Sequence, residues 1–147
     1  MQLNKFSDYA LRVLMFVSRP RETPYTIAEI AAKLEVSENH LVKVVHFMSK
    51  KNWLITTRGK GGGIRLNPTA LTLFLGDILR TLEADDHIVN CDTPPCVLRQ
   101  HCGLKGILDQ AVNQFYNHLN RYTLADVLSQ PPIIKSALNS TIPLLEL

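Results

Sequence analysis

The three cysteines of this 147-residue chain all lie within one segment of twelve residues. They are Cys91, Cys96 and Cys102, in the spacing C-x4-C-x5-C, and the segment also holds a Pro-Pro pair and His101. Thiolates are soft ligands that suit Zn²⁺ or an iron–sulfur cluster, and three of them leave one coordination position for another group. Structural zinc usually takes two cysteine pairs far apart in sequence, and His101 directly precedes Cys102, so both would be strained in reaching one ion. The spacing therefore favours an iron–sulfur cluster, with zinc, thiol redox chemistry or inert cysteines as alternatives.

Composition narrows the class of protein that carries these thiols. With 46% hydrophobic and 20% charged residues, the chain resembles an ordinary globular protein of one domain or two small ones. Its first six residues lack the apolar core of a signal peptide, and its apolar runs fall short of the ~20 residues of a membrane span. We therefore expect a cytoplasmic protein without a membrane partner, in which reducing conditions disfavour disulfides.

Enzymatic activity is not indicated by the remaining polar residues. No Ser-His-Asp signature or catalytic carboxylate pair occurs, and Asp85-Asp86 is more simply a solvated pair of charges. A thiol oxidoreductase would need a closer C-x-x-C-like pair with a reactive cysteine. We expect a protein that is not an enzyme.

Charge separates the two halves of the chain. Residues 1–67 hold eleven Lys or Arg against five Asp or Glu, a net of +6, whereas residues 68–147 hold five against eight, a net of −3. A polyanion such as DNA would meet the basic half. Charged residues often only solvate a surface, so this asymmetry needs support from the elements that carry it.

Capping side chains mark three helix starts in the basic half. They are Ser7 before a helix over residues 8–18, Thr26 before one that ends near Leu34, and Ser37 before one that runs to about Lys51. Thr26 and Glu29 form a T-x-x-E capping box, and the turn between the second and third helices is short. Two helices joined in this way either pack together as a plain amphipathic pair or form a helix-turn-helix, whose second helix enters the major groove.

The segment that follows favours the helix-turn-helix. Residues 53–58 and 64–66 are rich in β-branched and aromatic residues, and GKGGG joins them. A nucleotide-phosphate loop would run from a strand into a helix, which this segment does not. A helix-turn-helix followed by a basic hairpin is a winged helix, and glycines at its tip let backbone amides approach phosphate. The residues that we expect to contact DNA are Thr26, Ser37, Asn39, His40, Lys43, Arg58, Lys60, Gly61 and Gly62, with Arg65 adding charge.

The second half is predicted to be helical around the cysteine loop. A helix over residues 72–83 precedes a loop at about 85–103, and a helix at about 104–119 carries Leu104, Leu108, Ala111, Phe115 and Leu119 at steps of four and three. That stripe either faces the chain's own core or, as we favour, pairs two subunits. Thr123 caps a short last helix, which Gln130-Pro-Pro132 ends before the tail. The fold expected is mainly α with a small β-hairpin: a winged-helix domain over residues 1–67, then a cluster-binding and dimerisation region over 68–147.

Six segments together resemble the NsrR-type nitric-oxide-sensing iron–sulfur repressors, relatives of the cluster-biogenesis regulator IscR. They are the cysteine loop and residues 1–12 (MQLNKFSDYALR), 36–43 (VSENHLVK), 58–64 (RGKGGGI), 76–83 (GDILRTLE) and 122–127 (YTLADV). IscR-like members place a histidine three residues after the last cysteine, where this chain has Lys105. This difference favours the nitric-oxide branch.

The resemblance implies a ligand set, partners and an effector. Cys91, Cys96 and Cys102 would hold an iron–sulfur cluster, [4Fe-4S] rather than [2Fe-2S], with Asp8 of the partner subunit as fourth ligand and Arg12 close by. By its position alone, Asp8 is simply a favourable acid near a helix N-terminus. The homodimer would repress genes for nitric-oxide detoxification from an inverted-repeat operator and release it when nitric oxide attacks the cluster. The alternative is a zinc- or thiol-dependent winged-helix redox regulator without a cluster.

Overall fold

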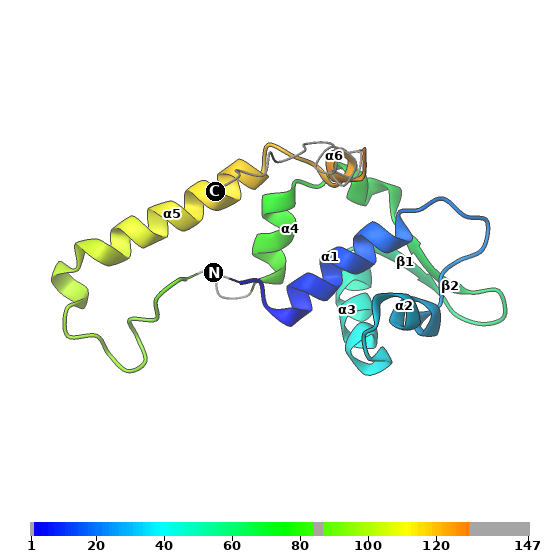
Figure 1. The fold of residues 1–147 in the computed structure, drawn as a ribbon, viewed down its shortest axis with the longest axis horizontal. Coiled ribbons are helices and arrows are strands. Elements are labelled where there is room, and N and C mark those ends of the chain that lie inside the picture. The colour runs from blue at the N-terminus through cyan, green and yellow to red at the C-terminus, as the bar shows by residue number, and fades with distance from the viewer. Residues whose placement is uncertain (1, 84–86, 130–147) are drawn as a thin grey trace, which may run out of the picture.

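The structure, a computed structural model, describes residues 2–83 and 87–129 and is mainly helical with one β-hairpin, as predicted (Figure 1). The predicted break at Gln130 and the Asp85-Asp86 pair lie outside the described residues. In chain order the elements are α1 (Lys5–Val17), α2 (Ile27–Leu34), α3 (Glu38–Lys50), β1 (Leu54–Thr57), β2 (Gly63–Leu66), a 3-10 turn (Pro68–Thr72), α4 (Leu75–Leu82), a second 3-10 turn (Arg99–His101), α5 (Gly103–Leu119) and α6 (Leu124–Ser129).

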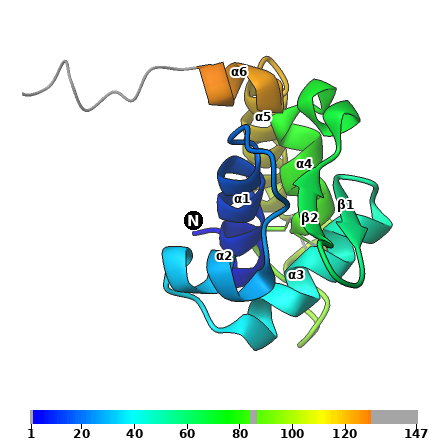
Figure 2. The ribbon, with the colours of Figure 1, turned by 90° about the vertical axis from the view of Figure 1, so that its right-hand side faces the viewer.

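The first three helices and the hairpin form most of the main core, to which α4 adds Ile78 and Leu82 and α6 adds Leu124. Apolar side chains recur on the inward face of each helix, and the largest of those fully buried include Leu14, Ile30, Leu41 and Met48. Phe6 of α1 meets Phe47 of α3 edge to face, with ring centroids 5.4 Å apart. Strands β1 and β2 pair antiparallel, Leu54 opposite Leu66 and Thr57 opposite Gly63. Figure 2 shows α2 and α3 together at one end of the molecule, with the hairpin beside them.

Helix α1 begins earlier than the sequence predicted. Its N-cap is Asn4, whose side-chain oxygen accepts a hydrogen bond from the Ser7 amide at 2.8 Å. Ser7 is inside the helix and fully buried, and its hydroxyl has no partner among the described residues. The predicted cap at Ser7 is wrong because Asn4, an equally good capping residue, stands one turn earlier.

Helix α4 begins later than predicted, at Leu75 instead of Thr72. Thr72 ends the 3-10 turn that Asn67 caps, and residues 73 and 74 are extended. Their backbone pairs with the start of α6: the Leu124 amide donates to the Leu73 carbonyl at 2.9 Å, and Phe74 bridges Thr123. This long-range pairing holds the chain straight where local sequence favours a helix.

Helices α4 and α5 cross in a second, smaller cluster. Leu79, Val112 and Tyr116 form its centre, with Leu3 and Leu11 packed against it. The Asn120 side chain accepts from the Asp77 amide at 3.0 Å and donates to the Asp77 carboxylate at 2.9 Å. We call the contact of Gly76 and Asp77 with Tyr116 and Asn120 the α4–α5 joint. It fastens the long helix to the winged body (Figure 1).

Candidate functional site

The outer face of α3 is a polar surface built on an apolar inner face. Leu41, Val44, Val45 and Met48 point inward, so Asn39, Lys43, His46 and Lys50 are exposed on the opposite side. Ser37 caps α3, and its hydroxyl also lies 3.0 Å from the His40 ring, which is near Tyr9. Ser37 and His40 therefore take part in a local structural contact at the start of the exposed helix.

The hairpin carries the other predicted DNA contacts at its tip. Arg58 and Lys60 are exposed, and Gly61 has φ +80°, a conformation that favours glycine. Gly62 donates its amide to the Gly59 carbonyl at 3.0 Å, and a Cβ there would stand 2.2 Å from the Thr57 carbonyl oxygen. Gly62 is thus required for the turn itself, and its amide is already used within the hairpin.

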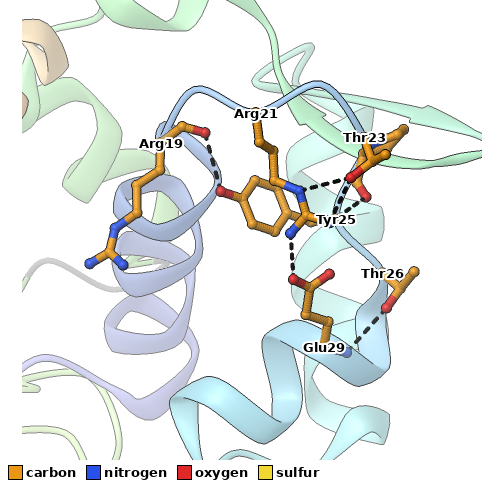
Figure 3. Close-up of polar contacts among 7 residues, drawn as sticks. Arg19, Arg21, Thr23, Tyr25, Thr26 and Glu29 are labelled. Atoms are coloured by element: carbon orange, nitrogen blue, oxygen red, sulfur yellow. Dashed lines mark hydrogen bonds and ion pairs between the residues drawn. The ribbon is translucent and has the colours of Figure 1, made fainter.

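A network of polar contacts joins the α1–α2 loop to α2 and to the hairpin, and Figure 3 shows its centre. The Arg21 guanidinium binds the Glu29 carboxylate and the Thr23 hydroxyl, and it covers the Tyr25 ring at 4.2 Å. Tyr25 donates its hydroxyl to the Arg19 carbonyl at 3.1 Å and pairs through its backbone with Ile64 of β2. We call Arg21, Tyr25, Glu29 and Arg65 the loop clamp.

Arg65 was predicted only to add positive charge to the hairpin, but in the structure it belongs to the loop clamp. Its guanidinium donates to the backbone carbonyls of Arg21, at 3.1 Å, and Glu22. Arg65 therefore holds the hairpin against the α1–α2 loop. Nothing in local sequence distinguishes it from Arg58, because its acceptors are more than forty residues away.

Replacing Glu29 with glutamine should lower stability in a pH-dependent way. The hydrogen bond from Arg21 holds the pKa of Glu29 below its ordinary 4.5, aided by the charge of Arg21 and the Thr26 amide and opposed by partial burial. A carboxylate whose pKa is lower in the folded state than in the unfolded state stabilises the protein fully at pH values above its unfolded-state pKa. This stabilisation is lost as the pH falls through its folded-state pKa. We expect Glu29→Gln to lower the urea midpoint modestly at pH 7, and the difference from wild type to shrink below about pH 4.5.

Metal-free protein should be used for these titrations, so that acid release of a metal does not intervene. Glu22→Gln is the matched control, because Glu22 lies in the same loop and enters the clamp only through its backbone carbonyl. If the urea midpoint of Glu29→Gln stayed below that of the wild type by a constant amount down to pH 3, the ionised Glu29 carboxylate would not be the source of the stability difference.

The three cysteines lie on the loop that leads into α5, at the end of that helix farthest from the hairpin (Figure 1). All are free thiols: Cys91 is buried, whereas Cys96 and Cys102 are partly exposed. The Cys96 amide donates to the Cys91 carbonyl at 3.0 Å, and Cys102 is the N-cap residue of α5. Within residues 2–83 and 87–129, no three His, Cys, Asp or Glu side chains gather closely enough to hold a metal ion. One chain therefore presents the thiols without assembling them into a closed site.

Basic side chains border the loop beside Cys91. A hollow of about 350 Å³ is lined by Cys91, Asp92, Arg99 and Lys105, among others. Lys105 binds Asp109 at 2.5 Å; this hydrogen bond raises the pKa of Lys105, with smaller contributions from Cys91 and Asp92. Arg99 is itself paired with Asp92. The three thiols fit a soft-ligand centre such as an iron–sulfur cluster, which needs a further ligand.

Asp8 and Arg12 form an ion pair on the surface of α1. Arg12 Nε lies 2.9 Å from Asp8 Oδ1, and the Asp8 side chain is 39% exposed. Within the described residues, Asp8 does not group with the cysteines of the same chain into a set of three metal ligands. An exposed carboxylate of this kind is accessible to a second subunit.

Helix α5 has apolar side chains that the described part of the chain leaves exposed. Val112 and Tyr116 are the residues that it buries against α4. Of the predicted stripe, Phe115 and Leu119 reach the edge of that cluster, whereas Leu104 is 61% exposed and neighbouring Ile107 65%. The sequence did not indicate Val112 and Tyr116 as the inward pair, and the stripe is divided between the two sides.

The arrangement of α2, α3 and the hairpin defines the class of this protein. A helix-turn-helix whose second helix is exposed, followed by a basic antiparallel hairpin, is the winged-helix arrangement of DNA-binding proteins. No helix among residues 2–83 and 87–129 is long and apolar enough to cross a membrane.

The chain belongs to the Rrf2 family, described as iron-dependent transcriptional regulators, whose model matches residues 3–130. It is accordingly a DNA-binding transcriptional regulator, in a family of regulators and not of enzymes.

Solved structures share its fold. CymR (YrzC), the global cysteine regulator of B. subtilis, is 22% identical with a TM-score of 0.70, the match covering 90% of this chain and 99% of that one. Oxidized Staphylococcus aureus CymR is 19% identical, with a TM-score of 0.68 and coverages of 90% and 99%. T. potens IscR is 22% identical, with a TM-score of 0.64 and coverages of 87% and 86%.

Proposed function

We propose that this regulator is a cytoplasmic homodimeric repressor that binds an inverted-repeat operator and senses nitric oxide through an iron–sulfur cluster. Residues 1–67 bind the DNA, and residues 68–147 hold the cluster and join the subunits. The cluster, [4Fe-4S] in the active form, is held by Cys91, Cys96 and Cys102 together with Asp8 of the partner subunit. The regulated genes are those for nitric-oxide detoxification.

One observation carries the proposal: all three cysteines of the chain lie on one loop that leads into α5, outside the main core of the winged body. The main core contains none of these cysteines, so they do not serve to pack the winged body. When bound, a cluster supplies iron atoms to which nitric oxide adds. The exposed Leu104 and Ile107 give α5 an apolar side on which a second subunit can pack.

A chain of contacts connects the cysteine loop to the DNA-binding helix. Cys102 is the N-cap residue of α5, and the α4–α5 joint holds α5 against α4. At the end of α4, the Glu83 carboxylate accepts two hydrogen bonds from Asn4, at 3.0 and 2.9 Å. Asn4 caps α1, whose Phe6 packs on Phe47 of α3. A displaced loop therefore shifts the spacing of the two α3 helices in the dimer, which must match the helical repeat of DNA.

Asp8 is suited to be the ligand that leaves. A carboxylate is a hard oxygen donor, held less firmly than thiolate in a soft site. Arg12 stands ready to pair with it, as it does in the single chain at 2.9 Å. Release of Asp8 of the partner subunit would free the loop of one chain from α1 of the other.

The test uses the full-length protein purified without oxygen. We expect bound iron and acid-labile sulfide, and at least about a tenfold rise in the operator Kd after nitric oxide, equal to about 1.4 kcal/mol. The operator is first selected by the protein from random double-stranded DNA. Protein that contained stoichiometric zinc, or no metal, and bound DNA equally with and without nitric oxide would favour the zinc- or thiol-dependent alternative.

A further inference from the structure

An apolar side chain stands exposed on the DNA-facing side of α3. Val42 is 52% exposed, three residues after Asn39 and four before His46, so the three side chains are neighbours on the helix surface. It does not belong to the inward face, which Leu41, Val44, Val45 and Met48 occupy. A single exposed valine is unremarkable on most surfaces. On a helix that enters the major groove, it lies where base edges are read.

The surroundings of Val42 are suited to DNA. Val42 lines a hollow of about 400 Å³ between α3, the start of α2 and the hairpin, together with Thr26, His46 and Arg58. No acidic side chain among the described residues lines this hollow. The other aliphatic side chains that line the hollow, Ile27, Val45 and Ile64, are buried or half-buried, so Val42 is the exposed one among cationic and hydroxyl groups. Such surroundings complement phosphates around a base edge.

We propose that Val42 reads a thymine by packing its methyl groups against the thymine 5-methyl group. This inference rests on the proposed binding of the operator through α3, and it names what one position of α3 recognises. Valine cannot hydrogen-bond a base, and the thymine methyl is the apolar group that base pairs present in the major groove. Asn39, one helical turn away, is of the type that binds adenine N6 and N7. Together they would favour an A·T pair or an A·T-rich step in each half-site.

The experiment removes one methyl group at a time from the DNA. Wild-type protein selects its site from random double-stranded DNA, and each thymine is then replaced by deoxyuridine, which lacks only the 5-methyl group. At one thymine of each half-site, the replacement should weaken wild-type binding by about 3–10-fold. The Val42→Ala variant should bind the unmodified thymine site about as weakly as the wild type binds the deoxyuridine site. It should also bind the thymine and deoxyuridine forms with equal affinity. Alanine favours helix, so α3 should stay folded, which circular dichroism checks.

Lys60→Ala is the matched control, because Lys60 is exposed on the hairpin tip, outside the hollow. It should weaken binding to all DNA alike through loss of a phosphate contact, and keep the full methyl effect. A methyl effect of equal size in wild type and Val42→Ala would overturn the inference, as would a site at which no thymine methyl matters. Failure of the wild type to select any site would overturn the proposed function as well.

Discussion

Changing Cys91, Cys96 or Cys102 to serine, one at a time, should abolish iron and sulfide binding while the chain still folds and dimerises. A serine hydroxyl is a hard and weakly acidic donor, so it replaces thiolate poorly as an iron ligand. The fold should survive because the main core contains no cysteine, and the apolar side of α5 is unaltered. Iron and sulfide assays test the first part, and circular dichroism with sedimentation tests the second.

Thr93→Ser is the matched control for these variants. Thr93 lies in the same loop, is exposed, and offers no thiol. It should retain the wild-type iron and sulfide content. A cysteine variant that kept this full content would remove that cysteine from the proposed ligand set.

Mixed dimers decide whether Asp8 of the partner subunit completes the set. Asp8→Ala protein should hold its cluster less firmly and lose it faster in oxygen. A heterodimer of an Asp8→Ala chain with a Cys96→Ser chain should regain one complete site, because the intact carboxylate of the second chain meets the intact cysteines of the first. Heterodimers with only the absorbance of the Asp8→Ala parent would limit Asp8 to its ion pair with Arg12.

Gly76→Ala should destabilise the protein by about 2–3 kcal/mol, although alanine is the better helix former. A Cβ on Gly76 would stand 2.4 Å from the Tyr116 carbonyl oxygen and 2.3 Å from Asn120 Oδ1. The Tyr116 carbonyl is backbone, so it cannot yield unless α5 moves away from α4. Urea unfolding measures the loss, and an accompanying fall in operator affinity would show that the α4–α5 joint connects the two halves.

Gly106→Ala is the control with the opposite sign. Gly106 lies within α5, and a Cβ there meets nothing within 4 Å. Helix propensity alone should then raise stability, by up to about 1 kcal/mol. If Gly76→Ala and Gly106→Ala changed the free energy of unfolding equally, the close approach of α5 to α4 would not constrain Gly76.

The sequence alone determined the features that depend on near neighbours. Thr26 and Ser37 cap α2 and α3 as predicted, because a capping side chain bonds to an amide within three residues. The glycine run marked the hairpin, and the spacing of Cys91, Cys96 and Cys102 placed the thiols on one loop.

The tertiary structure decided the features whose partners are distant in sequence. Residues 73 and 74 remain extended because they pair with residues 123 and 124, and Arg65 serves the clamp because its acceptors are the carbonyls of Arg21 and Glu22. Val112 and Tyr116 are the residues that α5 buries, with Phe115 and Leu119 of the predicted stripe at the edge of the same cluster, since the position of α4 selects which face is covered. Periodicity shows that a helix has an apolar side; which part of it is buried depends on what packs there.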